Sequence, residues 1–344
     1  MPDRVAPVAG GLLRDQLGRI ARDLRVSLTD RCNLRCSYCM PPEGLAWLPD
    51  EQTLTDAEVL RLCTIAVRRL GIRKIRFTGG EPLLRRGLAD IVAGCAGLIT
   101  DEGTPPDLAL TTNGLGLAHR AQTLAAAGLR RVNISLDTLD PAHFRQITHR
   151  DRLPDVLAGI AAARASGLAP IKVNAVVVRG VNDADAADLL DFCLASGIEL
   201  RFIEQMPIGP PHSWSRRRLV TRADLLDLLG ARHRLTPVAR QDPAAPARLW
   251  YIDGDPSRTV GIVASVSAPF CAACNRTRLT SDGQIRSCLF STTETDLRTP
   301  LRAGAGEQAL ADLWRAAMWP KPIAHGLDET TFATPSRIMS RIGG

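Results

Sequence analysis

The chain has 344 residues, of which 45% are hydrophobic and 23% are charged, as is ordinary for a globular protein. No apolar run approaches the roughly 18 to 20 residues that cross a bilayer, and the N-terminus lacks the sustained apolar core of a signal peptide. We therefore expect a cytoplasmic protein without a membrane partner.

The net charge of +7 and the pI near 9.2 suggest an anionic partner. The 43 cations are spread along the chain and only 4% of the residues are aromatic, so we expect no nucleic acid. A small anionic molecule fits at least as well. Arginine is the usual cation here, since only Lys74, Lys172 and Lys321 are lysines.

Strand-like and helix-like segments alternate from the first predicted strand to residue 203. The predicted strands span residues 24–28, 74–78, 108–112, 131–136, 171–178 and 199–203. The predicted helices span residues 55–71, 87–98, 118–127, 153–166 and 184–196. Repeated βα units predict an α/β fold with a parallel sheet, either doubly wound or barrel-like.

One face of every predicted strand is polar, because residues i and i+2 of a strand share a face. A closed eight-stranded barrel is filled with aliphatic side chains, and buried cations need partners. We therefore predict a wide, partial (β/α)6 barrel around a wet, positively charged cavity. The alternative is a half-exposed antiparallel sheet, which would leave the helices no sheet face to cover. The polar face consists of Arg25, Ser27, Thr29, Lys74, Arg76, Thr78, Thr111, Asn113, Asn133, Ser135, Asp137, Lys172, Asn174, Glu199 and Arg201.

A smaller, β-rich region is predicted beyond Pro207. It contains a helix at 221–230, strands near 249–253 and 259–265, and a hairpin at 278–290 whose turn is Asp282-Gly283. The expected organisation is a flexible N-terminus at 1–14, the barrel at 15–206, the appended region at 207–342 and a Gly-Gly tail at 343–344.

Six of the nine cysteines form two groups of three. Cys32, Cys36 and Cys39 have the spacing C-x3-C-x2-C and follow the first strand, and Cys271, Cys274 and Cys288 have the spacing C-x2-C-x13-C. An iron–sulfur cluster with one open iron explains three thiols, while zinc with a distant fourth ligand or redox thiols remain alternatives. His325 could complete a zinc site at the second group. Cys63, Cys95 and Cys193 lie among apolar residues and are expected to be core thiols.

The first cysteine motif, with Tyr38 before the third cysteine, and TGGEP at 78–82 resemble the radical S-adenosylmethionine (SAM) superfamily. There SAM binds the open iron of a [4Fe–4S] cluster and is cleaved to a 5′-deoxyadenosyl radical. The chain also resembles the GTP 3′,8-cyclase family over residues 15–344. The motifs that carry this closer resemblance are LTTNG, NISLD, IKVNAVV, RFIEQMPIG, CNRTRLTSDGQIRSCLF and the terminal Gly343-Gly344.

The resemblance implies the first step of molybdenum cofactor biosynthesis, in which the radical takes hydrogen from the ribose C3′ of GTP and C3′ then attacks guanine C8. It implies two [4Fe–4S] clusters, one on Cys32, Cys36 and Cys39 and one on Cys271, Cys274 and Cys288. It implies SAM contacts from Tyr38, Gly80, Ser135 and Met206, and a tail, Gly343 and Gly344, that enters the active site. The implied GTP-binding residues are Arg25, Lys74, Arg76, Thr111, Lys172, Arg201, Arg276, Thr277 and Arg278.

The same resemblance implies partners. The product would pass to cyclic pyranopterin monophosphate synthase, an electron donor such as flavodoxin or ferredoxin would serve the clusters, and a homodimer is possible. Two other functions stay open at this point. One is a radical SAM maturase that modifies a peptide, and the other is a zinc-stabilised protein that binds nucleic acid.

Overall fold

The computed structural model describes residues 11–327, 332, 334–335 and 337–343, and there it contains one twelve-stranded sheet. The strand order is β12-β11-β10-β1-β2-β3-β4-β5-β6-β9-β8-β7. Neighbours from β1 to β6 are all parallel, so the parallel βα prediction is confirmed and the antiparallel alternative is wrong. These strands are β1 (Asp23–Ser27), β2 (Lys74–Thr78), β3 (Asp107–Thr112), β4 (Arg131–Ser135), β5 (Ile171–Val177) and β6 (Glu199–Glu204).

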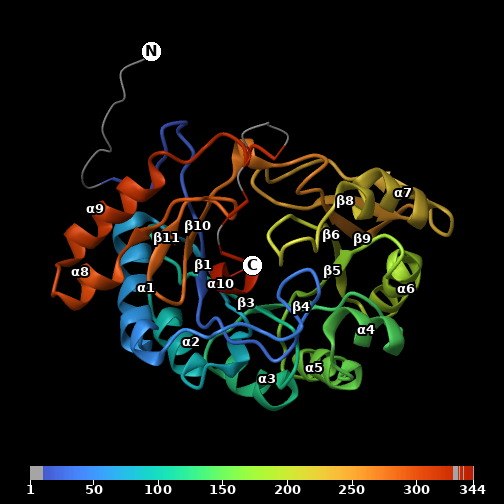
Figure 1. Cartoon of the computed structure of the whole chain (residues 1–344), viewed down its shortest axis with the longest axis horizontal. Coiled ribbons are helices and arrows are strands. Elements are labelled where there is room, and N and C mark those ends of the chain that lie inside the picture. Colours follow the sequence, from blue (N-terminus) through green and yellow to red (C-terminus); the bar gives the residue numbers. More distant parts are fainter. Residues whose placement is uncertain (1–10, 328–331, 333, 336, 344) are drawn as a thin grey trace.

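Helices follow the strands and lie on the outer side of the curved sheet (Figure 1). They are α1 (Asp56–Leu70), α2 (Leu88–Ala96), α3 (Leu117–Ala126), α4 (Pro141–Thr148), α5 (Leu153–Ala165) and α6 (Ala186–Ala195). In α1 the Thr55 side chain and Glu58 form a reciprocal capping box, and Gly71 ends the helix with φ 74°, which favours glycine. Helix α4 was not predicted. It is preceded by the N-cap residue Asp140, whose side chain accepts from two main-chain N–H groups.

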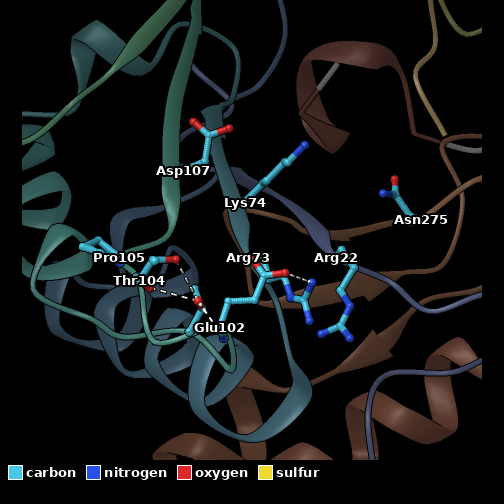
Figure 2. A pocket seen from close by; sticks show the side chains of 9 residues that line it. Arg22, Arg73, Lys74, Glu102, Thr104, Pro105, Asp107 and Asn275 are labelled. Carbon is cyan, nitrogen blue, oxygen red and sulfur yellow. Dashed lines mark hydrogen bonds and ion pairs between the residues drawn. The ribbon is translucent and has the colours of Figure 1, made fainter. Parts of the chain in front are cut away.

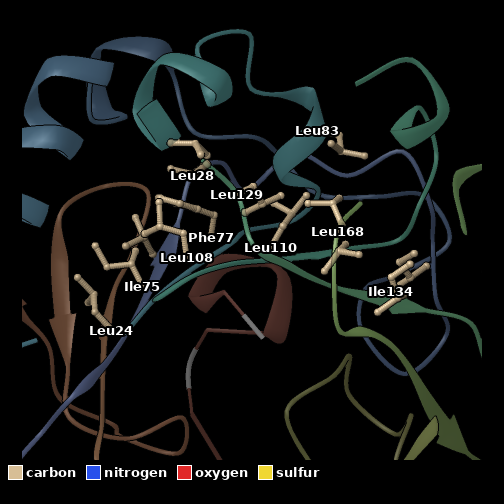
Figure 3. Close-up of a cluster of buried hydrophobic side chains, with 14 of the residues drawn as sticks. Leu24, Leu28, Ile75, Phe77, Leu83, Leu108, Leu110, Leu129, Ile134 and Leu168 are labelled. Carbon is tan, nitrogen blue, oxygen red and sulfur yellow. The ribbon is translucent and has the colours of Figure 1, made fainter. Parts of the chain in front are cut away.

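The main hydrophobic core lies between the sheet and these helices (Figure 3). It is built from the apolar alternate residues of the strands, each fully buried one contributing roughly 1.5–3 kcal/mol. Period-2 alternation therefore sends the apolar residues outward to the helices and the polar ones inward. The strand residues in this core include Leu24, Val26, Ile75, Phe77, Leu108, Leu110, Val132, Ile134, Val173, Leu200 and Phe202.

The C-terminal region extends both edges of the same sheet. Strand β9 (Asp255–Val263) pairs in parallel with β6, and β10 (Arg276–Leu279) pairs in parallel with β1. The predicted hairpin is present, with β10 antiparallel to β11 (Gln284–Arg286) and Gly283 at φ 80°. The outer strands are β7 (Leu235–Pro237), β8 (Arg248–Ile252) and β12 (Thr295–Asp296).

The C-terminal helices are α7 (Arg222–Gly230), α8 (Arg298–Arg302), α9 (Glu307–Met318) and α10 (Met339–Ile342). Only α7 was predicted. Helix α10 lies inside the curve of the sheet (Figure 1). Short 3₁₀ turns occur at Asp50–Gln52, Pro82–Leu84, Asp183–Asp185, Arg216–Arg218 and Cys271–Ala273.

Of the expected flexible N-terminus, residues 1–10 lie outside the described part of the chain, whereas Leu13 is fully buried in the core. Within the described residues, no helix combines the length and hydropathy needed to span a membrane.

Candidate active site

The strand register brings the polar residues of neighbouring strands together on the inner face of the sheet. Arg25 on β1 lies opposite Arg76 on β2 and Arg278 on β10. Further along, Asn133 on β4 lies opposite Thr111 on β3 and Lys172 on β5. The sequence-predicted polar face is therefore continuous across the sheet, and β10 extends it past β1.

Carboxylates neutralise only part of this cationic face. Arg131 pairs with Asp107, and Lys172 pairs with Glu199. Asp23 forms a long ion pair with Arg276, in which Oδ2 lies 3.9 Å from Nε. Within the described residues no ion pair involves the three arginines at the centre of the face, and the Nε of each is buried without a hydrogen-bond partner. These three are Arg25, Arg76 and Arg201.

The guanidinium groups disfavour one another's charge. Burial lowers the pKa of Arg201 to about 10, and the nearby charge of Arg76 adds to the effect. Burial also lowers the pKa of Arg278 to about 10 and that of Arg25 well below its usual value. Buried like charges without counter-ions are costly. An anion of high charge is the ligand that this face can bind.

Lys74 lies at the edge of this face. It is exposed at the start of β2 and lines a cavity of about 390 Å³ together with Arg22, Arg73 and Asp107 (Figure 2). The cavity sits at the amino-terminal ends of β1, β2 and β3. Lys74 is thus placed to meet the outer end of an anion bound on the face.

One residue predicted to bind GTP, Thr277, directs its side chain away from the inner face. Two residues that were not predicted, Arg131 and Asp23, lie on that face. The Thr277 hydroxyl is completely buried and accepts a hydrogen bond from Trp314 Nε1 of α9, at 3.0 Å on the outer side of the sheet. The i, i+2 rule applied from Asn133 and Arg25 would have found Arg131 and Asp23.

The first cysteine group lies on the loop after β1, packed against the TGGEP loop. A Cβ on Gly80 would lie 2.3 Å from the carbonyl oxygen of Arg31, so only glycine permits this approach. Gly80 N also donates to the carbonyl of Thr29, at 2.7 Å. The cysteine loop is thereby fixed to the end of β2.

Burial raises the pKa of the Cys32 thiol to about 11 and that of Cys39 to about 12. Donors face both sulfur atoms. Asn113 Nδ2 lies 3.8 Å from Cys32 Sγ, and the main-chain N–H of Ser340 lies near Cys39 and lowers the pKa of its thiol. Hydrogen bonds to sulfur are a usual way in which proteins tune a bound iron–sulfur cluster.

Two of the predicted SAM contacts, Gly80 and Tyr38, lie at this group. Tyr38 donates its hydroxyl to Asp137 Oδ2 at 2.7 Å, which ties the cysteine loop to the end of β4. Ser135 is half-buried on the same strand face. Met206 follows β6 and packs with Leu219 and its neighbours.

The second cysteine group borders the cationic face through Cys274. Its sulfur accepts from Lys321 Nζ at 3.4 Å and from Arg276 Nη1 at 3.8 Å. Burial acts to raise the pKa of the Cys274 thiol, yet the charges of Lys321 and Arg276 bring it down to about 7. Cys288 lies near Cys271 and interacts electrostatically with Arg278.

His325 is not available as the zinc ligand that the sequence allowed. Its Nε2 donates to the carbonyl of Ser265 at 2.9 Å, and its Nδ1 accepts from the N–H of Leu327 at 3.0 Å. Within the described chain no three His, Cys, Asp or Glu side chains converge on a single point. A cubane binds each cysteine through a different iron, and both groups of thiols, with donors on their sulfur atoms, fit that chemistry.

The tail joins the two halves of the site. A Cβ on Gly343, whose φ is 70°, would lie 2.5 Å from Thr78 Oγ1, and its carbonyl accepts from Arg278. Because Ser340 contacts Cys39 as well, the tail lies between the first cysteine group and β10. Gly344, also predicted for the site, is outside the described residues.

Two family models match the chain. The model of the radical SAM superfamily matches residues 26–193, and the model described as Molybdenum Cofactor Synthesis C matches residues 198–327. A protein named GTP 3′,8-cyclase from Corynebacterium glutamicum is 57% identical, covering 99% of this chain and 92% of its own length. One of the same name from Mycobacterium sp. (strain KMS) is 55% identical, covering 100% and 98%.

Solved structures resemble the fold. SuiB from Streptococcus suis superposes with a TM-score of 0.58 at 15% identity, covering 89% of this chain and 67% of SuiB. The structure of SuiB bound to S-adenosylmethionine gives a TM-score of 0.59 at 14% identity, covering 90% and 66%. At this identity the likeness concerns the fold alone.

Proposed function

Because the chain belongs to the GTP 3′,8-cyclase family of radical SAM enzymes, we propose that its two cysteine groups serve two different ligands. The protein cyclises GTP in molybdenum cofactor biosynthesis, with SAM and [4Fe–4S] clusters as cofactors. The product is 3′,8-cyclo-7,8-dihydro-GTP. The roles of individual residues follow from where they lie.

The first cluster is held by Cys32, Cys36 and Cys39, and when bound it supplies the electron that cleaves SAM to a radical. Residues 15–206 provide this half of the site. Gly80 brings main chain close to the loop, and Tyr38, Ser135 and Met206 line the space beside it. The contact of Tyr38 with Asp137 keeps the loop oriented.

GTP is held between the cationic face and the second cluster on Cys271, Cys274 and Cys288. The observation that carries this assignment is the set of half-buried arginines that form no ion pair within the described residues, since a triphosphate carries close to four negative charges. Arg25, Arg76, Lys172, Arg201, Arg276 and Arg278 bind it, with Lys74 at the outer end and Thr111 beside Asn133. Thr277 contributes through its main chain only.

The tail is proposed to close the site over the substrate. Gly343 lies against β1 and β2, where any side chain would collide with Thr78. The region from residue 207 onward thus extends the sheet at both edges and brings Gly343 to its inner face.

We also propose the cellular context. The nine cysteines are all unpaired thiols, which suits the reducing cytoplasm. A one-electron protein donor such as flavodoxin or ferredoxin would reduce the clusters, and cyclic pyranopterin monophosphate synthase would take up the product.

Anaerobic reconstitution followed by incubation with SAM, reductant and GTP tests the proposal by mass spectrometry. GTP and SAM should be consumed together, to give 5′-deoxyadenosine and a product with the mass of GTP, without any added peptide. Consumption of SAM that depends on a peptide but not on GTP would instead favour the maturase.

A further inference from the structure

Lys321 is a buried lysine that the proposed reaction does not use. It follows α9 by three residues, is only 2% exposed, and was the one lysine without a role in the sequence motifs. Its ammonium group donates to Cys274 Sγ at 3.4 Å, to the Cys274 carbonyl at 3.0 Å and to the Arg276 carbonyl at 2.8 Å. All three N–H groups of the ammonium are therefore used.

The opposite charges near Lys321 are thiols and not carboxylates. No ion pair with Asp or Glu involves Lys321 in the part of the chain that the structure describes, and the groups whose negative charge would stabilise its ammonium are Cys274, in contact, and Cys288. A buried ammonium is costly unless it is paired, and its other two acceptors are neutral carbonyls. The sulfur of Cys274 is the atom in contact that can carry the compensating negative charge, which it does as a thiolate.

The two cysteine groups differ in whether cationic side chains donate to their sulfur atoms. At the first group the neutral Asn113 amide faces the sulfur of Cys32, and the one nearby cation, Arg35, donates to the carbonyls of Cys32 and Leu34 and not to a sulfur atom in the described residues. At the second group, Cys274 receives two cationic donors, Lys321 and Arg276. Arg276 lies farther from the sulfur and also donates to the carbonyl of Ala244, so Lys321 is the closer and more dedicated of the two.

We propose that Lys321 is a positioning residue that sets the electronic state of the second cluster. Its ammonium charge draws electron density from the Cys274 thiolate, which raises the reduction potential of the bound cluster. Its two carbonyl contacts hold residues 274–276, so that the thiolate and the guanidinium of Arg276 keep their relative positions. This inference rests on the proposed assignment of the second cluster to Cys271, Cys274 and Cys288.

The test isolates the second cluster in the full-length chain by replacing Cys32, Cys36 and Cys39 with alanine. Into this parent we would introduce Lys321→Gln, which keeps hydrogen-bond donors but removes the charge, and Lys321→Arg, which keeps the charge. Each protein is reconstituted anaerobically with iron and sulfide. Iron per chain and the midpoint potential from an EPR-monitored redox titration are measured, and circular dichroism reports folding.

The parent should hold about four irons per chain, as expected for one cubane. Lys321→Gln should shift the midpoint potential to a more negative value, while Lys321→Arg should stay close to the parent. If Lys321→Gln folds but loses the cluster while the parent and Lys321→Arg keep it, the result would also support a need for the positive charge beside Cys274. Equal potentials in the parent and Lys321→Gln would overturn the inference. A parent without iron would refute the cluster assignment itself, which is a different failure.

Discussion

At the scale of single residues, the site concentrates groups that are unfavourable for folding. The inner face of the sheet holds more cations than carboxylates, and Arg25, Arg76 and Arg201 lack ion-pair partners within the described residues. Such groups persist because the ligand needs them. Removing one of them should therefore have opposite effects on stability and on binding.

Arg201→Met is expected to raise the melting temperature of the GTP-free protein, because a buried charge repelled by Arg76 is replaced by an apolar side chain of similar length. It should weaken GTP binding by about 10- to 100-fold, the loss of roughly 1.5–3 kcal/mol. Thermal melts with and without GTP measure both effects. Arg164→Met on the exposed side of α5 is the control and should change neither. A lower melting temperature with undiminished GTP binding would contradict the prediction.

Neighbouring positions of β10 should differ because their side chains point to opposite faces. Arg276→Ala should weaken GTP binding by roughly 1.5–3 kcal/mol and leave SAM cleavage without substrate intact. Thr277→Val should bind GTP normally but lose about 1 kcal/mol of stability with the Trp314 hydrogen bond. Equilibrium dialysis with GTP and urea unfolding provide the two readouts. If Arg276→Ala also abolished SAM cleavage, separate SAM and GTP sites would be untenable.

Glu81 should make stability depend on pH. Burial raises its pKa from 4.5 to about 7, against the hydrogen bonds from Asn113, Leu83 and Thr112. Because the folded state holds this proton more tightly, its contribution is present below pH 4.5 and is lost as the pH rises to about 7. The loss is on the order of 3 kcal/mol. Urea unfolding at pH 5 and pH 7 should show a smaller difference in Glu81→Gln than in the wild type. If the stability difference between pH 5 and pH 7 were the same in both proteins, Glu81 would not be the group responsible.

At the scale of elements, the short helix α10 depends on contacts made just before it. Arg337 donates both ends of its guanidinium to Asp282 at the hairpin turn, at 2.8 and 2.9 Å, and pairs with Glu294 at 2.8 Å. A four-residue helix has little intrinsic stability. A half-buried bidentate pair therefore anchors the tail from outside the helix.

Arg337→Ala should release the tail from the inner face. Hydrogen exchange at residues 337–343 should become faster, and GTP turnover should fall while the iron content stays unchanged. The control is Arg302→Ala, which breaks the ion pair with Glu58 on the outer surface and should leave exchange in the tail as it is. Unchanged exchange in Arg337→Ala would show that α10 is held by its other contacts.

At the scale of the whole molecule, one sheet joins the two halves of the chain. Because β10 lies beside β1 and β9 beside β6, the C-terminal region cannot be removed without exposing both edges of the barrel strands. The same pairing places the first cysteine group after the carboxyl end of β1 and Cys274 before the amino end of β10, so the two groups, about 240 residues apart in sequence, lie at opposite ends of neighbouring strands.

The reconstituted protein should contain about eight irons per chain, from two cubanes. Replacing Cys32, Cys36 and Cys39 with alanine should leave about four, and so should replacing Cys271, Cys274 and Cys288. Cys193→Ala, on the buried face of α6, should retain about eight. Iron and sulfide analysis with absorbance near 400 nm measures this. Zinc at one or two per chain without that absorbance would refute the cluster assignment.

Much of the fold was predictable because the sequence repeats a local rule. Apolar and polar residues alternate in β1 to β6, and helix caps such as Thr55 and Gly71 mark the ends of α1. Helices α4 and α9 were missed, since their patterns lie in loop-like or Arg-rich surroundings. The side-chain direction of Thr277 was also missed, because the family motif names residues without their strand faces.

The two cysteine groups, the parallel βα order and the polar inner face could be predicted from the amino-acid sequence, because spacing and alternation are local properties of the chain. The folded structure was needed to show which charges stay unpaired, that Lys321 reaches Cys274, and that the tail lies between Cys39 and Arg278. Those contacts join residues far apart in the chain. Their existence depends on strand pairing and packing, which no short stretch of sequence encodes.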